Sequence, residues 1–502
     1  MSTRRLNRIG LILLGGVGGV LASVAIHAVA QRGGDPLPLR ELQQFANVYS
    51  AIKSSYVEPL EDASLINEAI KGLFNDLDPH SSYLDTEAFK DMESTTQGGF
   101  GGLGIELGYE NKYPTVIAPI EDTPAAKAGI LAGDQIIGID DKPTKEMPLN
   151  DAVKLMRGEP QTSIKLTIKR GDQEPFDVDL VRDHIKVKSI RAKRLEDDIL
   201  YVRVSQFQER TASDLLQQIQ DLSTDQPAKG LVLDLRNDPG GLLDSAIGVS
   251  SAFLDSGNLV VSTKGRVPSA NREYYVKPLT QVLGNANTQL VNQLQWLKEV
   301  PVVVLINGGS ASASEIVAGA LQDHERATVI GNRSFGKGSV QSVLPLGNSA
   351  GIKLTTALYY TPSGKSIQVT GVEPDIYVDD TASGNLFRIP READLQRHLN
   401  NSGLEDENSL VDDTEDYVKD PKMFEFGGDD DFQLQQALNH LAGRTVKKSD
   451  PQLAQAESAP EDSSDSTAAT SEAEKKTPKQ IDKSAPNVKR YRITPEGIQA
   501  VP

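Results

Sequence analysis

The spacing of hydrophobic positions divides the chain into segments that predict different secondary structure. In residues 36–95, apolar side chains recur three and four positions apart, which predicts amphipathic helices. Residues 96–183 have the pattern of short strands with glycine turns and one helix, typical of a small β-rich domain. Over residues 184–380 strands alternate with helices. The runs Leu231–Leu235 and Val302–Ile306 are nearly continuously apolar, as in strands buried on both faces.

The two ends of the chain differ from its middle in composition. Three arginines precede an apolar run that ends in Ala-Val-Ala, so residues 1–31 are expected to be an export signal. The run is also long enough to span a bilayer, so an uncleaved membrane anchor is the alternative. Residues 381–446 are polar, with one more helix expected at Leu434–Leu441. Residues 447–502 are rich in Ser and acidic residues, and we expect them to be disordered.

Charge and cysteine content exclude several classes of function. The formal net charge of −18 argues against nucleic acid as a partner. The absence of cysteine excludes thiol catalysis, thiolate metal sites and disulfides. The sequence also lacks the H-E-x-x-H motif of metalloproteases, so we expect neither a metal nor a cofactor.

A glycine-rich segment, Gly99–Gly104, matches the dinucleotide fingerprint, but strand-like residues follow it where that motif requires a helix. A glycine turn that leads into an edge strand can instead hold a peptide carboxylate on its N–H groups, while the strand pairs with the peptide. The stretch resembles a PDZ domain in which Leu103, Gly104 and Ile105 form the carboxylate-binding loop. An ordinary glycine turn in a small β domain is the alternative.

A run of small residues between a buried strand and a predicted helix contains the candidate nucleophile, Ser312. Such a strand–turn–helix presents a side chain at a helix N-terminus, where free N–H groups and the helix dipole stabilise an oxyanion. The run is not the G-x-S-x-G elbow, because Ser314 occupies the position of the last glycine. A Ser-Ala run of this kind also caps helices without any catalytic role, so the alternative stays open.

A serine nucleophile needs a base, and Lys337 is the remaining candidate. His324 would lie roughly 15–18 Å from Ser312, at the other end of the helix, and His80 has the sequence context of a turn. Burial lowers a lysine pKa toward the range in which the amine accepts a proton at neutral pH. Gln341, four residues further on, can orient the amine. Glycine-flanked lysines are common in loops, so the residues alone leave the assignment open.

Taken together, these motifs resemble the carboxy-terminal processing (tail-specific) serine proteases of the Ser-Lys type. The resemblance covers roughly residues 37–380, and the spacing of 25 residues from Ser312 to Lys337 and four more to Gln341 is that of the family. The matching segments are, in chain order, Leu77–Ser81, Gly101–Glu106, Asp234–Gly241, Gly309–Ile316 and Phe335–Gln341.

The resemblance implies a ClpP/crotonase-like αβ protease core, with an inserted β-rich PDZ domain and an N-terminal helical segment. In that core Ser312 would be the nucleophile, Lys337 the general base and Gln341 the residue that positions the lysine.

The resemblance also implies an oxyanion hole. The N–H of Ala313 would form it together with the N–H of Gly240 or Gly241. Asp323 matches an acidic position that is sometimes grouped with the catalytic residues. It lies too far along the helix for direct proton transfer, so we interpret it as structural support.

The implied function is an exported serine endopeptidase that recognises substrate C-termini through its PDZ domain. Implied partners are proteins with exposed, apolar C-termini, a helical-repeat adaptor, and further copies of the chain joined through the N- and C-terminal helices. The implied location is the periplasm, either in solution after signal cleavage or anchored to the inner membrane. Two alternatives stay open, a non-catalytic PDZ scaffold and a crotonase-like acyl hydrolase.

Overall fold

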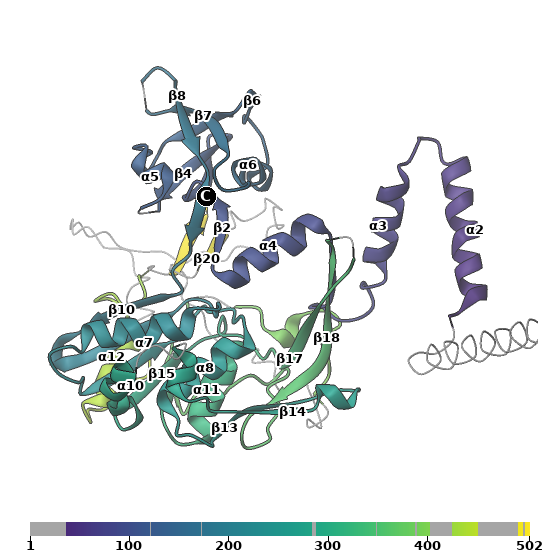
Figure 1. The fold of residues 1–502 in the computed structure, drawn as a ribbon. Helices are drawn as coiled ribbons and strands as arrows, with labels where there is room; N and C mark the ends of the chain where they lie inside the picture. Colours follow the sequence, from purple (N-terminus) through teal and green to yellow (C-terminus); the bar gives the residue numbers. More distant parts are fainter. Residues whose placement is uncertain are drawn as a thin grey trace, which may run out of the picture. The chain divides into compact units, whose positions relative to one another are not determined.

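The computed structural model forms two compact units, Met1–Leu73 and Phe74–Pro502 (Figure 1). It describes residues 37–120, 122–171, 173–283, 288–347, 349–386, 389–401, 424–449, 490–494 and 497–501. The expected signal or anchor at residues 1–31 lies outside these ranges. Within them, no helix is both long and apolar enough to cross a membrane.

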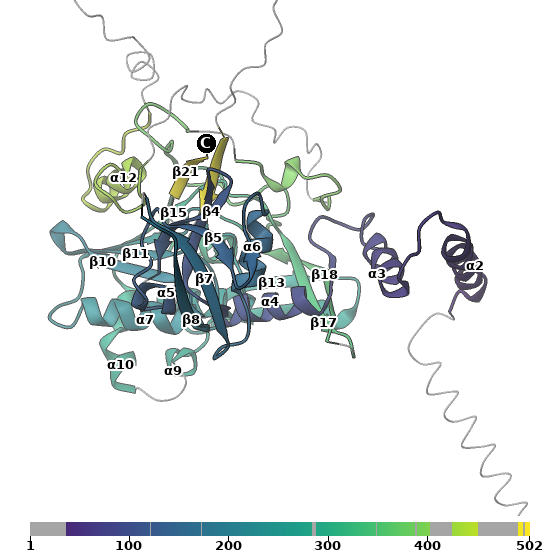
Figure 2. The same cartoon turned by 90° about the horizontal axis from the view of Figure 1, so that it is seen from above.

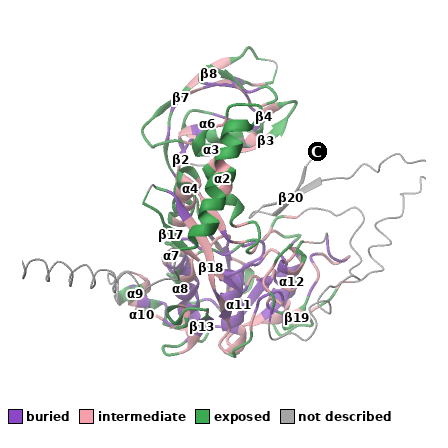
Figure 3. Cartoon of the chain, turned by 90° about the vertical axis from the view of Figure 1, so that its right-hand side faces the viewer, coloured by how far each residue is buried: buried purple, intermediate pink, exposed green. Residues whose placement is uncertain are grey.

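The described part of the first unit is a pair of helices, α2 (Leu39–Ser55) and α3 (Asp62–Gly72), as the apolar spacing predicts. Figures 1 and 2 both show them side by side. Asp62 joins them, because it accepts a hydrogen bond from the Tyr49 hydroxyl at 2.6 Å and pairs with Lys53 at 2.6 Å. Neither helix contains a buried residue (Figure 3).

The αβ core is built on a six-stranded sheet of order β10-β11-β12-β15-β16-β19. Its strands are parallel except β10, which is antiparallel to β11. They are β10 (Ile190–Arg194), β11 (Ile199–Val204), β12 (Gly230–Asp234), β15 (Val302–Ile306), β16 (Thr328–Gly331) and β19 (Ile376–Tyr377). Every residue of β12 and β15 is buried, which confirms the prediction made from their apolar runs.

Helices cover both faces of this sheet, which is why its strands lack an alternating polar pattern. Val302 and Val304 face one apolar cluster, with residues of α7 (Thr211–Leu222), α8 (Leu243–Phe253) and α11 (Ala313–Asp323). Val303 and Leu305 face a second cluster, with residues of α12 (Phe432–Leu441). Shorter helical segments are η1 (Glu196–Asp198), η2 (Pro268–Ala270), α9 (Leu279–Val282), α10 (Thr288–Gln293), η3 (Gln295–Lys298) and η4 (Glu392–Asp394).

A second, antiparallel sheet carries the residues that follow the candidate nucleophile in the chain. Its order is β1-β18-β13-β14, and β17 also pairs with β18. The strands are β1 (Ser82–Leu84), β13 (Leu259–Lys264), β14 (Arg272–Tyr275), β17 (Ser339–Pro345) and β18 (Gly351–Tyr360). Residues 36–95 were expected to be helical throughout, and β1 corrects this. Its three residues form a strand because they pair with β18, a partner far away in sequence.

The inserted domain has the predicted strands and helices. Its sheet has the order β3-β4-β5-β7-β8, with β6 paired to β5, so β3 is an edge strand. Its elements are β3 (Ile105–Glu110), β4 (Tyr113–Pro119), α5 (Pro124–Lys127), β5 (Gln135–Ile139), β6 (Lys142–Pro143), α6 (Leu149–Met156), β7 (Ser163–Lys169) and β8 (Phe176–Val181). The helix α4 (Thr86–Gln97) and the paired strands β2 (Gly99–Gly102) and β9 (Asp183–Lys186) connect this domain to the core.

The C-terminal region contains one expected and one unexpected element. The helix expected at Leu434–Leu441 is present as α12, which begins two residues earlier. The expectation that all of residues 447–502 are disordered is wrong for β20 (Arg490–Thr494) and β21 (Gly497–Val501), which pair antiparallel. Polar and apolar residues alternate in Arg490–Thr494, a strand signal that the composition of the whole tail conceals. Residues 450–489 lie outside the described ranges.

Candidate active site

Ser312 stands on a sharp turn between β15 and α11, at the N-cap position of the helix. Its backbone angles are φ 55° and ψ −109°, a region that non-glycine residues rarely occupy. Its side chain is almost buried, with 5% of its surface exposed. Strain of this kind persists only where the surrounding structure enforces it, and it is concentrated at functional sites.

Hydrogen bonds tie this turn to the loop that follows β12. The Ser310 hydroxyl donates to the carbonyl of Leu235 at 2.8 Å, and the N–H of Ala311 donates to the carbonyl of Asp238 at 2.9 Å. The Ser314 hydroxyl donates to the same Asp238 carbonyl at 3.0 Å. The turn that carries Ser312 and the loop after β12 therefore form one hydrogen-bonded unit.

Glu315, in the first turn of α11, links the turn that carries Ser312 to the loop that carries Lys337, which we call the lysine loop. Its Oε2 accepts the N–H groups of Ser312 at 2.8 Å and of Lys337 at 2.9 Å. Its Oε1 accepts the Ser334 hydroxyl at 2.6 Å and the Gly336 N–H at 2.7 Å. Burial raises the pKa of Glu315 to about 7, although these four hydrogen bonds act in the opposite direction. The sequence identified Glu315 only as part of a motif.

Lys337 lies in the loop before β17 and lines the same cavity as Ser312, a space of about 1,010 Å³. Burial lowers the pKa of Lys337 to about 8, and the positive charge of Lys353 acts in the same direction. The carboxyl groups of Glu392, Glu315 and Asp78 act in the opposite direction. Among the described residues, none forms a hydrogen bond or ion pair with the Lys337 amine. The amine is therefore partly neutral near pH 8 and is not committed to a partner.

The spacing of four residues would place Lys337 and Gln341 on one face of a continuous strand, but the structure does not form such a strand. Lys337 precedes β17, and the pairing of β17 with β18 shifts register between Val340 and Gln341. The Gln341 amide nitrogen donates to the Ser339 hydroxyl at 2.9 Å and to the Thr355 hydroxyl at 3.2 Å. Gln341 nevertheless lines the same cavity, so its role toward the lysine stays a prediction.

The hydroxyl of Tyr359 contacts the hydroxyl of Ser312. The Tyr359 oxygen lies 3.3 Å from Ser312 Oγ, and the N–H of Tyr359 donates to the Gly338 carbonyl at 2.7 Å. Burial raises the pKa of Tyr359, so the hydroxyl keeps its proton at neutral pH. Sequence reasoning missed this residue, because it lies 47 residues after Ser312, on β18, where the alternating pattern of the strand gives no sign of its contact.

The two glycines proposed for the oxyanion hole differ in what their N–H groups do. The Gly240 N–H donates to Asp238 Oδ1 at 2.8 Å, so it is already occupied. Within the described part of the chain, the N–H groups of Gly241 and Ala313 have no acceptor. Gly240 has a φ of +92°, and a Cβ on it would lie 2.8 Å from Ala313 N. Gly240 therefore allows the loop to approach the helix end, and the structure favours Gly241 as the donor.

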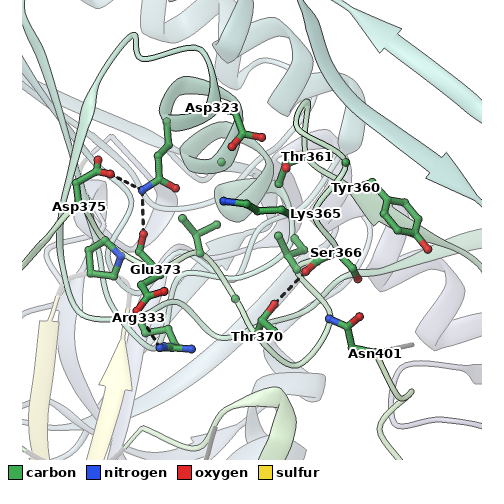
Figure 4. Close-up of a pocket in the computed structure, with 17 residues that line it drawn as sticks. Asp323, Arg333, Tyr360, Thr361, Lys365, Ser366, Thr370, Glu373, Asp375 and Asn401 are labelled. Atoms are coloured by element: carbon green, nitrogen blue, oxygen red, sulfur yellow. Dashed lines mark hydrogen bonds and ion pairs between the residues drawn. The ribbon is translucent and has the colours of Figure 1, made fainter. Parts of the chain in front are cut away.

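Asp323 lies at the other end of α11 and lines a different cavity, of about 990 Å³ (Figure 4). Its Oδ2 accepts the N–H of Ser363 at 2.8 Å. Ser312 and Lys337 do not line this cavity. The structure therefore does not bring Asp323 to the nucleophile.

The segment around Asp78 is connected to Gln341 through the side chain of Thr355. Asp78 accepts the hydroxyl of Thr355 at 3.0 Å, and Thr355 in turn bonds Gln341. His80 lies in a turn, as expected, but its Nε2 also contacts the buried carboxyl group of Glu392 at 2.7 Å. This second contact has no signature in the sequence, because the two residues are 312 positions apart.

The predicted carboxylate-binding loop lies at the start of the edge strand β3. Leu103 is buried in the core of the PDZ domain, and Ile105 is the first residue of β3. Gly104 has a φ of +75°, and a Cβ on it would lie 2.4 Å from the side chain of Thr123. The loop therefore needs glycine at this position. In the described ranges, no group of three or more His, Cys, Asp or Glu side chains could hold a metal ion.

Comparison with known proteins places these features in one family. A sequence model of peptidase family S41 matches residues 198–378, a PDZ model matches residues 115–170, and a model of the activating protease CtpB N-terminal domain matches residues 22–88. A carboxy-terminal-processing protease of Bartonella bacilliformis is 45% identical over 446 residues, 87% of this chain and 96% of the relative. The chain belongs to the carboxy-terminal processing proteases.

The comparisons also find more distant relatives. The carboxy-terminal processing protease CtpA of Bacillus subtilis is 34% identical over 329 residues, 65% of this chain and 67% of that protein. A solved photosystem II D1 C-terminal processing protease aligns with 66% of this chain and 92% of its own, at 28% identity and a TM-score of 0.39.

The family that the motifs predicted is confirmed, and so is the fold class, an S41 αβ core with a PDZ domain. The chain is a serine-type peptidase. This result disfavours the two alternatives, the non-catalytic scaffold and the acyl hydrolase.

Proposed function

We propose that this chain is an exported endopeptidase that binds the C-terminus of a protein substrate on its PDZ domain and cleaves the substrate with Ser312 and Lys337. The observation that carries the proposal is the pair itself. A strained serine at a helix N-terminus and a lysine with a pKa lowered to about 8 line one cavity. A neutral amine beside an activated hydroxyl is the arrangement that nucleophilic catalysis without histidine requires.

In the proposed mechanism the neutral Lys337 amine takes the proton of Ser312 Oγ as the oxygen attacks the substrate carbonyl. The oxyanion that forms is stabilised by the N–H groups of Gly241 and Ala313, which lack other acceptors among the described residues. The amine then protonates the leaving nitrogen and later activates water to release the acyl group. Gln341 would hold the amine with its side-chain oxygen, since its nitrogen already donates elsewhere.

In the proposed recognition step, a substrate C-terminus adds to the edge strand β3 as a further strand. The terminal carboxylate would be held by N–H groups of Leu103, Gly104 and Ile105. The position of β3 supports this proposal, because among the described strands β3 pairs on one side only, with β4, and an edge strand can pair with a peptide through main-chain hydrogen bonds. We propose that apolar residues next to β3 determine which substrate side chains are preferred, so that apolar C-termini are favoured.

Replacing either catalytic residue should abolish cleavage. We expect Ser312→Ala and Lys337→Ala each to lower kcat at least about a thousandfold. Losses of this size are typical when one member of a group of catalytic residues that act together is removed. The measurement is cleavage of a protein with an apolar C-terminus, followed by mass spectrometry, with circular dichroism to show that each variant is folded. A matched substrate whose terminal carboxylate is amidated should be cleaved more slowly by the wild type. Persistent cleavage by both variants would refute the assignment, and equal rates on the two substrates would refute tail recognition.

The pH dependence should follow the Lys337 amine. kcat/KM should rise with pH and level off above about 8, because only the neutral amine accepts the proton. Lys353→Met removes a positive charge that lowers this pKa, so the pKa of Lys337 should rise and the profile should move to higher pH. At pH 7 we expect a loss of roughly several-fold, with the plateau unchanged.

Lys365→Met is the matched control for this shift, since Lys365 lines the other cavity. Its pH profile should coincide with that of the wild type. A Lys353→Met profile that stays in place would show that the titrating group is not Lys337.

We also propose that the N-terminal helices join copies of the chain. Leu42, Phe45 and Val48 form an apolar stripe on α2 and are 47%, 49% and 54% exposed. Two helices without any buried residue cannot stabilise each other alone, so a second copy of the same hairpin is the proposed cover. The C-terminal helix α12 already packs on the core of its own chain, so we confine this proposal to α2 and α3.

Light scattering after size-exclusion chromatography tests the assembly. Phe45→Glu with Val48→Glu should reduce the oligomer to a monomer, because the charges cannot be buried between two hairpins. Gln43→Glu with Asn47→Glu adds the same charge on an exposed polar part of α2 and should keep the wild-type mass. The wild type could instead be a monomer that binds a helical-repeat protein. If only the Phe45→Glu, Val48→Glu variant loses that protein, the cover of the helices is an adaptor and not a second copy.

Residues 1–31 are proposed to export the protein to the periplasm. A chain that lacks these residues should stay in the cytoplasm, whereas the full chain should be protected from added protease until the outer membrane is opened. Sequencing the N-terminus of the exported protein separates a cleaved signal from an anchor. Cytoplasmic recovery of the full chain would contradict the proposal.

A further inference from the structure

Among the described residues, Arg236 is the largest side chain that is fully buried, and it lies two residues after β12, just before the proposed oxyanion loop, Asp238–Gly241. Its guanidinium contacts Asp234 through Nε at 3.0 Å and through one terminal nitrogen at 2.6 Å. It also contacts both carboxylate oxygens of Asp431, at 2.8 and 2.6 Å. All three side chains are completely buried. Two-pronged pairs of this kind fix the orientation of an arginine as well as its charge.

The partner carboxylate belongs to a segment that we call the C-terminal brace, residues 424–433. From the brace, Gln433 also accepts a hydrogen bond from Arg236 at 3.0 Å, and the ring of Phe426 lies 4.3 Å from the guanidinium carbon. Asp431 additionally accepts the N–H of Gly427 at 2.8 Å and the N–H of Leu434 at 3.1 Å, so it fixes the brace and the start of α12 together. The brace lies outside residues 198–378, the region that the S41 model matches.

Arg203, on β11, contacts both Arg236 and Asp234 and so belongs to the same buried network. One of its terminal nitrogens donates to the backbone carbonyl of Arg236 at 3.0 Å, and another lies 3.3 Å from Asp234. Its guanidinium also lies over the Phe426 ring, at 4.5 Å. Both the side chain and the backbone of Arg236 are therefore held, and the ring of Phe426 contacts both arginines.

The chain passes from Arg236 directly into the loop that faces the nucleophile. The N–H of Asn237 donates to Asn307 Oδ1 at 2.9 Å, and the Asp238 carbonyl accepts hydrogen bonds from the turn that carries Ser312. The Gly240 N–H is turned onto Asp238 Oδ1, which leaves the N–H of Gly241 without an acceptor in the described part of the chain. A shift of Arg236 would therefore be transmitted to the oxyanion donor within five residues.

We propose that the C-terminal brace positions the oxyanion loop, Asp238–Gly241, by holding Arg236, and that Asp431 and Phe426 are positioning residues for the reaction. Neither touches the substrate, and both act through Arg236. The proposal rests on the proposed function, in which the N–H of Gly241 stabilises the oxyanion. It assigns a catalytic purpose to a segment that lies beyond the matched peptidase region.

The test compares binding of a transition-state analogue with binding of substrate. In a peptide boronate, boron bonds to Ser312 Oγ, the hydroxyl proton passes to the neutral Lys337 amine, and a boronate oxygen occupies the oxyanion site. Asp431→Asn should weaken boronate binding on the order of 100-fold and lower kcat similarly, as when one oxyanion donor is lost, with little change in KM. Asp431→Glu keeps the charge and should recover part of the loss.

Phe426→Leu is the second variant, because it removes the ring and leaves every charge paired. It should weaken boronate binding to a smaller extent, and it keeps the proposal testable if Asp431→Asn does not fold.

Hydrogen exchange adds a measurement that does not depend on activity. In both variants the amides of residues 238–242 should exchange faster than in the wild type, while those of β15 stay protected.

His440→Gln is the matched control. It removes a contact of α12 with Thr328, 3.1 Å long, on the same helix but away from Arg236. At equal thermal stability it should leave boronate affinity unchanged. Wild-type affinity and wild-type exchange in the folded Asp431→Asn and Phe426→Leu variants would overturn the proposal, as would an equal loss in His440→Gln. A wild type that forms no adduct at Ser312 would instead refute the proposed function, and the exchange data would still decide on the brace.

Discussion

The carboxylate of Glu315 accepts hydrogen bonds from both segments that carry the proposed catalytic side chains. One of its oxygens holds the N–H of Ser312 and the N–H of Lys337, which belong to different parts of the fold. The strained backbone of Ser312 persists because this contact and the bonded turn before it leave no relaxed alternative. In the described part of the chain, the carboxyl group of Glu315 bonds the backbone N–H groups of Ser312 and Lys337 and forms no hydrogen bond with either side chain.

Among the described residues, no hydrogen bond joins the side chains of Ser312 and Lys337 directly, although both line one cavity. Ser312 Oγ contacts the Tyr359 hydroxyl, and within the described residues the Lys337 amine bonds no group. Tyr359 also bonds the backbone of Gly338, the residue after the lysine, so a movement of the lysine loop would change both contacts.

The sequence predicted what local patterns encode. The helices α2, α3 and α12, the strands of the PDZ domain and the buried strands β12 and β15 follow from apolar spacing alone. Ser312 and Lys337 followed from the spacing of motifs. What the sequence could not predict depends on contacts between distant residues. The strand β1 exists because of β18, the occupied N–H of Gly240 became apparent only with the loop geometry, and the pair of Arg236 with Asp431 joins residues 195 positions apart.

A network of buried charged groups lies next to the proposed oxyanion site. Burial alone would raise the pKa of Asp234, but Arg236 and Arg203 lower it to about 2, so this carboxyl group is ionised. Burial raises the pKa of Asp238 well above its usual range. Arg203 and Arg236 contact the carboxyl group of Asp234, and Arg236 also contacts that of Asp431, so each buried arginine faces at least one acidic side chain. Asp238 Oδ1 accepts the N–H of Gly240, and the next N–H in the chain, that of Gly241, has no acceptor among the described residues. In the proposed mechanism, this contact of Asp238 decides that Gly241 rather than Gly240 is the oxyanion donor.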